Sequence, residues 1–357
     1  MRLALIIYGS LEGHSGGYLY DRRLVEHLRS AGDTVEVISL PWRAYPWLLT
    51  QNFSRPLAQR LQALDVDLLL QDELNHPSLI LPNRRWNAAG KPRIISIVHH
   101  LRSSELHPRL VLRLYRAVER RYLETLGGFI FNSHTTQAAV QDLLGRPVTG
   151  VVAYPGGDQI GAGMSLEAIE QRLQHDPTSP LRLLFVGSII PRKGLHTLLK
   201  ALRKIKSARW TLDIVGGVGD KTYASQMLLL AAPLGEKVRF RGRVVDGDLR
   251  AIFETHDVLV MPSSYEGFGI VYLEGMACGL PPIATRAGAA GEIITDGANG
   301  FLLPPEDANA LADCIYRLTA DRTWLADLSR RARRRFDEFP TWEQSATAAR
   351  AYLLSFL

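Results

Sequence analysis

The chain has 357 residues, of which 46% are hydrophobic and 22% are charged. This composition is typical of a soluble globular protein and excludes a disordered or fibrous one. The length exceeds one ordinary core and predicts two domains of roughly 150 to 180 residues each, with a cleft between them. The two cysteines, Cys278 and Cys314, exclude a disulfide framework and are expected to be buried free thiols in a reducing compartment.

The net charge of +6 arises mainly in the first part of the chain. Residues 1–150 contain 18 basic and 13 acidic residues, whereas residues 151–357 contain 24 and 23. This asymmetry predicts an acidic partner, either an anionic membrane surface or a phosphorylated acceptor. The apolar run at the N-terminus is too short for a membrane span and lacks a signal-peptide cleavage site. We therefore expect a cytoplasmic protein, with peripheral contact at the inner membrane face as a further possibility.

Short apolar runs rich in β-branched residues alternate with stretches of helical period, which predicts parallel sheets covered by crossover helices. The first series of predicted strands is Leu3–Tyr8, Thr34–Ser39, Leu68–Gln71, Ile94–Val98, Gly128–Phe131 and Gly150–Tyr154. The second series is Leu181–Val186, Thr211–Val215, Val238–Arg241, Val258–Met261, Pro282–Ala284 and Gly300–Leu302. The pattern predicts an α/β fold of two Rossmann-like domains facing a central cleft.

The predicted domains cover residues 1–155 and 156–340. The stretch Pro155–Pro180 is rich in glycine and proline, and we expect it to hold the hinge and one short helix. After Pro340 the residues Trp342–Leu357 have the pattern of an amphipathic helix. We expect this helix to pack back on the first domain.

Two glycines and two histidines are the candidate site residues of the first domain. Gly16 and Gly17 follow the first strand and precede a helix predicted from Tyr18, so they form a turn with bare amides. The strand in SIVHHLRSSE ends in His99 and His100, where a polar group can reach a ligand at the cleft. Either histidine could point inward, and two surface histidines are the alternative. Ser133 is expected to be a helix N-cap.

Residues 107–126 predict a basic amphipathic helix, with Arg109, Arg113, Arg116 and Arg120 on one stripe. An aromatic-rich segment, residues 42–53, precedes it in the chain. Such segments can lie on anionic lipid. The alternative is a solvated helix face combined with buried aromatic side chains. No recognised nucleic-acid-binding module accompanies the charge, so we expect no nucleic-acid partner.

In the second domain, FVGSIIPRKGLHTLLKAL at 185–202 predicts a strand, a turn at Gly187, and a helix preceded by Arg192 and Lys193. These two cations could neutralise a diphosphate. A purely structural pair at a helix N-terminus is disfavoured, because cations there oppose the helix dipole.

The segment SSYEGFGIVYLEGMACGLPPIAT at 263–285 carries the strongest signal. Gly267 and Gly269 leave backbone amides bare before a helix predicted at Ile270–Ala277, and such amides form an anion site. Glu266 and Glu274 are eight residues apart, about two helical turns. They could accept hydrogen bonds from separate hydroxyl groups, whereas the alternative is a pair of solvated glutamates.

The run EGFGIVYLE, followed by GMACGLPPIAT and by E-I-I-x-D-G-x-N-G-F-L, resembles glycosyltransferase family 4. The resemblance implies a GT-B fold and a retaining transfer of sugar from a nucleotide-sugar, UDP- or GDP-linked, to a glycan, lipid or small-molecule acceptor, without a cofactor. It implies that Glu266 contacts the hydroxyls of the donor sugar and Glu274 the ribose. The amides facing the sugar and diphosphate would then be those of Gly267, Phe268, Gly269 and Ile270.

The resemblance extends to Gly187-x(5)-Lys193-Gly194, where the family usually has an arginine directly after the first glycine. Here that position is Ser188, and we expect Arg192 to supply the missing guanidinium. The stretch from Phe240 to Val244 occupies the place where similar enzymes hold the nucleobase. In the first domain the resemblance implies that Gly16 and Gly17 lie beside the diphosphate and acceptor. It also implies that His99 contacts the reacting sugar, although His100 replaces the usual aspartate.

No carboxylate is placed as an evident nucleophile for double displacement, so we expect transfer on one face of the sugar, with the diphosphate oxygen taking the acceptor's proton. No D-x-D pair stands in the segments predicted to hold the diphosphate, so cations and helix ends are expected to replace a metal ion. The alternatives are a phosphorylase or sugar-nucleotide epimerase, and a non-catalytic sugar-nucleotide-binding scaffold. A Rossmann dehydrogenase is disfavoured because no G-x-G-x-x-G follows the first strand.

Overall fold

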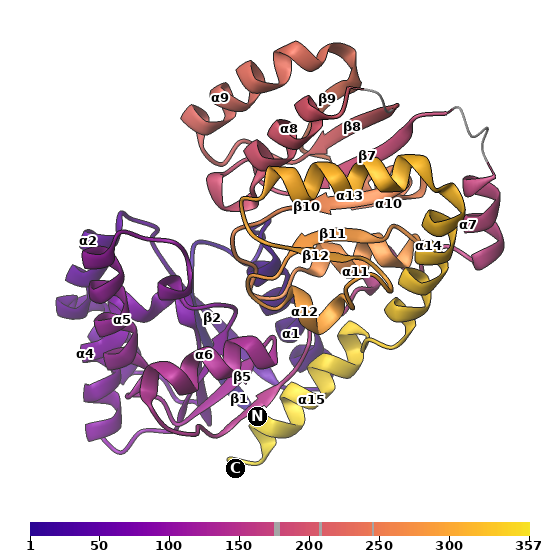
Figure 1. Ribbon diagram of the computed structural model, residues 1–357. Helices are drawn as coiled ribbons and strands as arrows, with labels where there is room; N and C mark the ends of the chain where they lie inside the picture. Colours follow the sequence, from indigo (N-terminus) through magenta and orange to yellow (C-terminus); the bar gives the residue numbers. More distant parts are fainter. Residues whose placement is uncertain (175–178, 207–208, 245) are drawn as a thin grey trace. The chain divides into compact units, whose positions relative to one another are not determined.

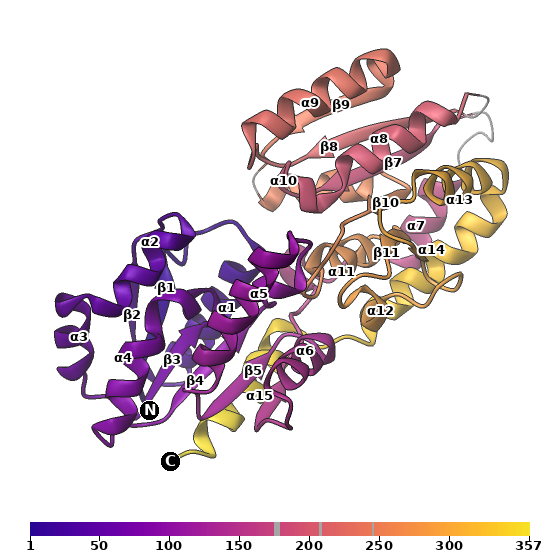
Figure 2. The ribbon, with the colours of Figure 1, turned by 60° about the vertical axis from the view of Figure 1, so that its left-hand side comes forward.

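The computed structural model describes residues 1–174, 179–206, 209–244 and 246–357. The chain divides into two compact units, Met1–Pro155 with Thr341–Leu357 (unit 1) and Gly156–Pro340 (unit 2). Each unit contains a six-stranded parallel sheet with helices on both faces (Figures 1 and 2). The predicted hinge segment extends over residues 175–178, which lie outside the described residues. Its described part contains a 3₁₀ turn, η4 (Asp158–Ile160), and α7 (Leu166–Leu173).

The sheet of unit 1 has the strand order β2-β1-β3-β4-β5-β6, with every neighbouring pair parallel. Its strands are β1 (Arg2–Tyr8), β2 (Thr34–Leu40), β3 (Leu68–Asp72), β4 (Ile94–Val98), β5 (Gly128–Phe131) and β6 (Gly150–Val152). The predicted strands of this unit are confirmed, and the last ends two residues earlier than expected. The order reverses between β1 and β3, so the loops after these two strands diverge and leave room for a ligand at the sheet edge.

The helices of unit 1 are α1 (Gly16–Ser30), α2 (Tyr45–Thr50), α3 (Arg55–Gln62), α4 (His76–Ala88), α5 (Arg109–Leu123), α6 (His134–Leu144) and α15 (Trp342–Leu354). Three 3₁₀ turns join them: η1 (Gln51–Phe53), η2 (Glu73–Asn75) and η3 (Arg102–Ser104). Ser15 caps α1, so Gly16 and Gly17 form its first turn rather than the separate turn we predicted. The predicted cap at Ser133 is confirmed, because its hydroxyl accepts a hydrogen bond from the Thr136 amide at 3.0 Å.

Unit 2 has the strand order β12-β11-β10-β7-β8-β9, again parallel throughout. Its strands are β7 (Leu181–Val186), β8 (Trp210–Val215), β9 (Val238–Gly242), β10 (Val258–Met261), β11 (Pro282–Thr285) and β12 (Phe301–Leu303). Its remaining helices are α8 (Leu195–Lys204), α9 (Lys221–Ala231), α10 (Asp246–Glu254), α11 (Ile270–Ala277), α12 (Ala290–Ile293), α13 (Ala308–Ala320) and α14 (Arg322–Asp337), with 3₁₀ turns η5 (Pro191–Lys193) and η6 (Ala232–Lys237). Every predicted strand of unit 2 is confirmed to within one residue at each end. The order reverses between β7 and β10.

The surface of unit 1 exposes large apolar side chains on α2, η1 and the start of α5. Trp47, Phe53 and Leu110 are 63%, 73% and 77% exposed. Our alternative of buried aromatic side chains is therefore wrong for Trp47 and Phe53. Cys278 and Cys314 are buried free thiols, as expected. Among the described residues, no helix combines the length and the apolar character needed to cross a bilayer.

Candidate functional site

Two loops of unit 2 meet at the point where its strand order reverses. One follows β7 and leads through η5 to α8, and the other follows the neighbouring β10 and leads to α11. Gly194 has a left-handed φ of 71°, and a Cβ atom there would lie 2.0 Å from the carbonyl oxygen of Pro262. Only glycine therefore lets the two loops approach this closely. In open α/β sheets, ligands bind at this reversal, outside the carboxyl ends of the strands.

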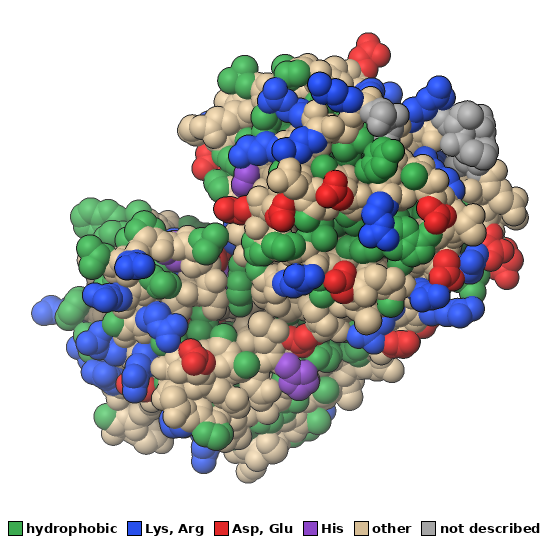
Figure 3. Space-filling view, in the orientation of Figure 1, with side chains coloured by type: hydrophobic (Ala, Val, Ile, Leu, Met, Phe, Trp, Pro, Cys, Tyr) green, Lys and Arg blue, Asp and Glu red, His purple; other side chains and the backbone are tan. Residues whose placement is uncertain are grey.

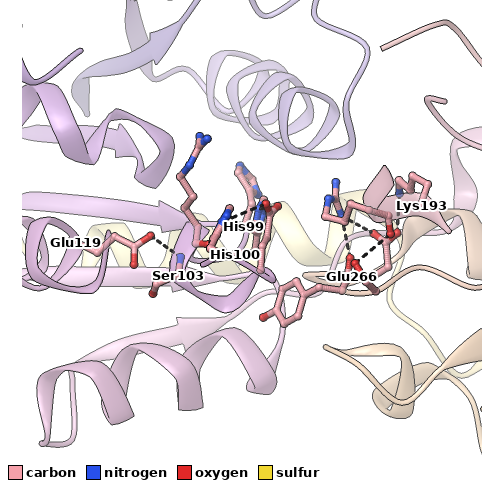
Figure 4. Close-up of polar contacts among 12 residues, drawn as sticks. His99, His100, Ser103, Glu119, Lys193 and Glu266 are labelled. Carbon is pink, nitrogen blue, oxygen red and sulfur yellow. Dashed lines mark hydrogen bonds and ion pairs between the residues drawn. The ribbon is translucent and has the colours of Figure 1, made fainter. Parts of the chain in front are cut away.

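Glu266 is the centre of this group and is buried (Figure 4). Lys193 Nζ lies 2.6 Å from Glu266 Oε1, Ser263 Oγ donates to the same oxygen at 2.7 Å, and Arg192 Nη1 lies 3.6 Å from Oε2. Burial alone would raise the pKa of Glu266, but the charges of Lys193 and Arg192 outweigh it and lower the pKa to about 2. The structure thus brings together three of the predicted site residues, because Lys193 and Arg192 both pair with the ionised carboxylate of Glu266.

Arg192 is held by the backbone of the neighbouring loop as well as by Glu266. Arg192 Nη1 donates to the carbonyl oxygen of Tyr265 at 2.8 Å, and the amide of Ser264 donates to the carbonyl oxygen of Arg192 at 2.8 Å. Because they sit directly before α8, the cations of η5 can receive phosphate oxygens. A ligand with a diphosphate and sugar hydroxyls matches this arrangement of two cations beside one acceptor.

The amide-rich turn before α11 lies directly after Glu266. Gly269 is the N-cap of α11 with a φ of 96°, and Glu274 is buried on that helix. Phe268 is also buried, so Gly267 and Gly269 flank a residue that anchors the turn in the core. The helix places Ile270 at its first position, where the backbone N–H groups have no partner within the helix. The predicted anion site therefore has the required local structure.

A second turn fixes the backbone of Glu266 from the other side. The amide of Ala289 donates to the carbonyl oxygen of Glu266 at 2.9 Å. Gly288 has a φ of 81°, and a Cβ atom there would lie 2.0 Å from the same carbonyl oxygen. The loops after β10 and β11 thus converge at the backbone of Glu266.

Gly187 and Val244 lie beyond the carboxyl ends of two other strands of the sheet, and a Cβ atom on Gly187 would lie 3.6 Å from Lys193 Cε. Gly187 directly follows β7, and its amide donates to the carbonyl oxygen of Val215 at 2.9 Å. Val244 comes two residues after β9, the edge strand, with β8 between β9 and β7. The parallel sheet places both residues beyond strand ends, and no described hydrogen bond links either one to Glu266.

Unit 1 has its own group of polar side chains at its strand-order reversal. His99 follows β4, and its Nε2 lies 3.1 Å from Asp21 Oδ1 on α1. A Cβ atom on Gly17 would lie 3.1 Å from His99 Cδ2, so the first turn of α1 packs directly on the imidazole ring. His100 instead pairs with Glu105 at 3.1 Å (Figure 4). His99 is buried, so the alternative of two surface histidines is wrong for this residue.

The charges around His99 are the reverse of those around Glu266. Burial alone would lower the pKa of His99, but the Asp21 carboxylate, with Asp72 and Glu73 nearby, raises it to about 9. Burial and the charge of Asp21 raise the pKa of Asp72 to about 7. His99 is therefore a protonated imidazolium at neutral pH, a group that donates hydrogen bonds but does not accept them.

Our sequence analysis missed Asp21, Asp72 and Ser263. Asp21 lies four residues after Gly17, so it shares a helix face with the glycine, and this spacing was a usable signal. Asp72 ends β3, at the reversal point of the sheet. Ser263 is three residues before Glu266, but nothing in the sequence distinguishes it from an ordinary loop serine.

Residues 167–335, within unit 2, match the family model described as Glycosyl transferases group 1. A D-inositol 3-phosphate glycosyltransferase from Arthrobacter sp. is 35% identical over 175 residues, which are 48% of this chain and 41% of the relative. A glycogen synthase from Mycobacterium tuberculosis is 31% identical over 179 residues, 49% of this chain and 43% of the relative. The chain spans about half the length of the curated relatives it matches.

Two solved structures resemble the whole chain. A sucrose-phosphate synthase from Thermosynechococcus elongatus has a TM-score of 0.80 and 22% identity, covering 99% of both chains. Anabaena HepE in complex with UDP-glucose has a TM-score of 0.77 and 21% identity, covering 100% of both chains. These likenesses and the two sheets define a two-domain, Rossmann-like GT-B fold. The match over residues 167–335 shows that unit 2 is similar to the glycosyl transferases of group 1.

Proposed function

We propose that the chain is a retaining glycosyltransferase of family 4 that transfers a sugar from a nucleotide-sugar to an acceptor hydroxyl. The observation that carries the proposal is the ionised Glu266 paired with Lys193 and Arg192 at the strand-order reversal of unit 2. It lies inside the segment that matches the glycosyl transferases of group 1. Several of the matched relatives are named as glycosyltransferases, and HepE was solved with UDP-glucose, which supports a nucleotide-sugar as donor.

Donor binding is assigned to unit 2, residues 156–340. The diphosphate takes the place of Glu266 as partner of Lys193 and Arg192, which frees the carboxylate to accept hydrogen bonds from sugar hydroxyls. The remaining donor contacts come from the loop and helix beyond Glu266 and from the other strand ends: Gly267, Phe268, Gly269, Ile270 and Glu274 toward sugar, diphosphate and ribose, Gly187 toward the phosphates, and Val244 toward the base.

The proposed reaction keeps the anomeric configuration. The bond between the anomeric carbon and the diphosphate oxygen breaks, the acceptor oxygen bonds to that carbon from the same face, and the acceptor's proton passes to the diphosphate oxygen. Lys193 and Arg192 stabilise the charge of the leaving diphosphate in place of a metal ion. In unit 1, Gly16 and Gly17 offer amides to the diphosphate and acceptor, and the His99 imidazolium donates a hydrogen bond to the reacting sugar.

Donor screening followed by turnover tests this proposal. We expect one of a series of UDP-, GDP- and ADP-sugars to raise the melting temperature, and NMR of the product to show the donor's anomeric configuration. Phosphate-dependent cleavage or an epimerised sugar without acceptor would instead identify a sugar-phosphate enzyme. Binding without turnover would identify a scaffold. If no donor stabilises the protein, the donor site is wrong.

The absence of a metal requirement has a separate test. We expect transfer to continue when EDTA is added to the assay, because in this proposal Lys193 and Arg192 stabilise the diphosphate without a metal ion. Loss of transfer that Mg²⁺ or Mn²⁺ restores would contradict this view.

The acceptor is proposed to be reached at an anionic membrane surface, by contact at the inner face of a cytoplasmic membrane. The exposed Trp47, Phe53 and Leu110 lie on elements that pack together, since the rings of Tyr45 and Tyr115 are 4.6 Å apart. Figure 3 shows hydrophobic side chains gathered near α2 and basic ones beside them on unit 1. We expect the protein to sediment with anionic vesicles at low salt and less at high salt. No binding at low salt contradicts the proposal.

A further inference from the structure

Three buried side chains of unit 1 converge outside the groups described above. Glu73 lies in η2, His76 begins α4, and Glu119 lies on α5. One oxygen or nitrogen atom of each lies within 4.8 Å of the others. Their exposed fractions are 1%, 1% and 0%, so water does not solvate them. We call these three residues the Glu73 cluster.

The carboxylates of the Glu73 cluster are not satisfied by the protein. Glu119 Oε1 accepts a hydrogen bond from the Ser103 amide at 3.0 Å (Figure 4). Glu119 Oε2 and both carboxylate oxygens of Glu73 have no hydrogen-bond partner among the described residues. A buried carboxylate without donors is strongly unfavourable unless a proton or a cation reaches it.

Arg102 could in principle donate hydrogen bonds to these carboxylates, but its guanidinium packs on aromatic rings instead. Its guanidinium carbon lies 5.2 Å and 4.9 Å from the ring centres of Tyr45 and Tyr115, so it stacks on two aromatic faces. No described hydrogen bond joins Arg102 to Glu73 or Glu119. The guanidinium thus leaves both carboxylate oxygens of Glu73 without a hydrogen-bond donor.

We propose that Glu73, His76 and Glu119 bind one Zn²⁺ ion. Two carboxylate oxygens and one imidazole nitrogen are a donor set that zinc accepts. His76 Nδ1 lies 3.1 Å from Glu73 Oε1 and 3.1 Å from the backbone carbonyl oxygen of Glu73, which accepts a hydrogen bond from it. His76 Nε2 lies 3.0 Å from the Tyr45 hydroxyl oxygen. Zinc binding would therefore move the ring proton from Nδ1 to Nε2, so that the ring donates to Tyr45 and presents the Nδ1 lone pair to the metal.

A second group of possible ligands, Asp21, Asp72 and His99, satisfies the same distance limit. It is the weaker candidate because one of its buried carboxylate oxygens, Asp21 Oδ2, lacks a hydrogen-bond partner within the described residues, whereas three oxygens of the Glu73 cluster lack one.

The zinc ion would connect η2, α4 and α5 of unit 1, next in sequence to Asp72 of the His99 group. Glu73 directly follows Asp72 in the chain, so fixing Glu73 fixes the residue that faces His99. The ion is therefore a positioning element and does not touch the sugar. This inference does not rest on the proposed transfer reaction, because zinc binding is measured without donor or acceptor.

Metal binding to the full-length, chelator-stripped protein tests the proposal. Equilibrium dialysis against ZnCl₂ with elemental analysis is expected to give one zinc per chain and a higher melting temperature. Cobalt titration of the same protein is expected to give the visible absorption bands of a low-symmetry Co²⁺ site. Failure of the wild-type protein to bind either ion at micromolar concentration overturns the inference.

Three variants identify the ligands. Glu119→Gln is expected to weaken zinc binding about a hundredfold or more, and Tyr45→Phe about tenfold, the usual range for a residue that orients a ligand. Glu124→Gln is the matched control, since Glu124 lies just beyond the last turn of α5 with its side chain 46% exposed, and it is expected to bind zinc normally. Tyr45→Phe removes only a hydroxyl, so it serves if Glu119→Gln does not fold. Unchanged binding in both Glu119→Gln and Tyr45→Phe, or binding lost in Asp72→Asn alone, overturns the assignment.

Discussion

Each unit surrounds one buried charged side chain with groups of opposite charge, and the signs of the charges are reversed between the two units. In unit 2 one buried carboxylate, Glu266, meets two cations, and its pKa falls to about 2. In unit 1 one buried imidazole, His99, meets the carboxylates of Asp21 and Asp72, and its pKa rises to about 9. Each group lies where the strand order of its sheet reverses.

This difference in charge indicates which part of a substrate each unit can bind. Two cations, Lys193 and Arg192, surround the Glu266 carboxylate, so an added anion finds a complementary site. In unit 1 the carboxylates exceed the imidazolium, and burial raises the pKa of Asp72 and Glu73 to about 7 and 8. Unit 1 therefore suits a neutral, hydroxyl-bearing group or a cation better than it suits a free phosphate.

Lys193→Ala gives the largest expected effect, because it removes one of the two cations that surround Glu266 in unit 2. The change removes the cation nearest to Glu266 and one of the two proposed diphosphate contacts. We expect kcat to fall by about 10² to 10³, the usual cost of deleting one group that stabilises developing charge. Steady-state kinetics with saturating donor measures it. Lys200→Ala, an exposed lysine on α8, is the control and is expected to leave kcat unchanged.

Stability against pH separates the two units and has the next largest expected effect. The pKa of Glu266 is lowered, so its contribution is complete above its ordinary value of 4.5 and is lost as pH falls toward 2. The pKa of His99 is raised, so its contribution is complete below 6.5 and is lost as pH rises toward 9. Each contribution is on the order of 3 kcal/mol.

Two variants measure these contributions by thermal unfolding across pH. The difference in melting temperature between wild type and Glu266→Gln is expected to shrink as pH falls below 4.5. The difference between wild type and His99→Asn is expected to shrink as pH rises above 6.5. Differences that stay constant with pH in both variants would show that neither ion pair stabilises the fold.

The fold was largely predictable because its signals are local. Parallel strands buried on both faces give short apolar runs, and the turns between elements contain glycine and proline. The start of α1 was placed two residues late, because glycine at Gly16 and Gly17 favours a turn while the Ser15 cap decides in favour of the helix. Helix boundaries depend on such single contacts, so a sequence pattern places them less accurately than it places the helices themselves.

The unit 2 site could be predicted to a large extent and the unit 1 site only in part. Glu266, Lys193 and Arg192 stand in two segments whose glycines and spacing resemble a known family, so the sequence names them directly. Asp21 and Asp72 have no such motif, and they meet His99 only because α1 crosses the reversal point of the sheet. A contact between three distant segments depends on the order of strands, which the periodicity of a sequence does not specify.

Gly17→Ala gives the smallest expected effect and tests whether the position of the His99 ring in unit 1 limits activity. The added Cβ atom lies 3.1 Å from His99 Cδ2, so the ring must shift by a few tenths of an ångström against Asp21. Alanine favours the helix more than glycine does, so we expect unchanged or slightly higher thermal stability with about tenfold lower kcat/KM, a loss of roughly 1.4 kcal/mol in transition-state binding. Gly247→Ala, where a Cβ atom meets nothing within 4 Å, is the control that separates helix propensity from the effect on His99. Equal activity in both variants would mean that the imidazole position does not limit transfer, because the same substitution differs between the two sites only in what the new methyl group touches.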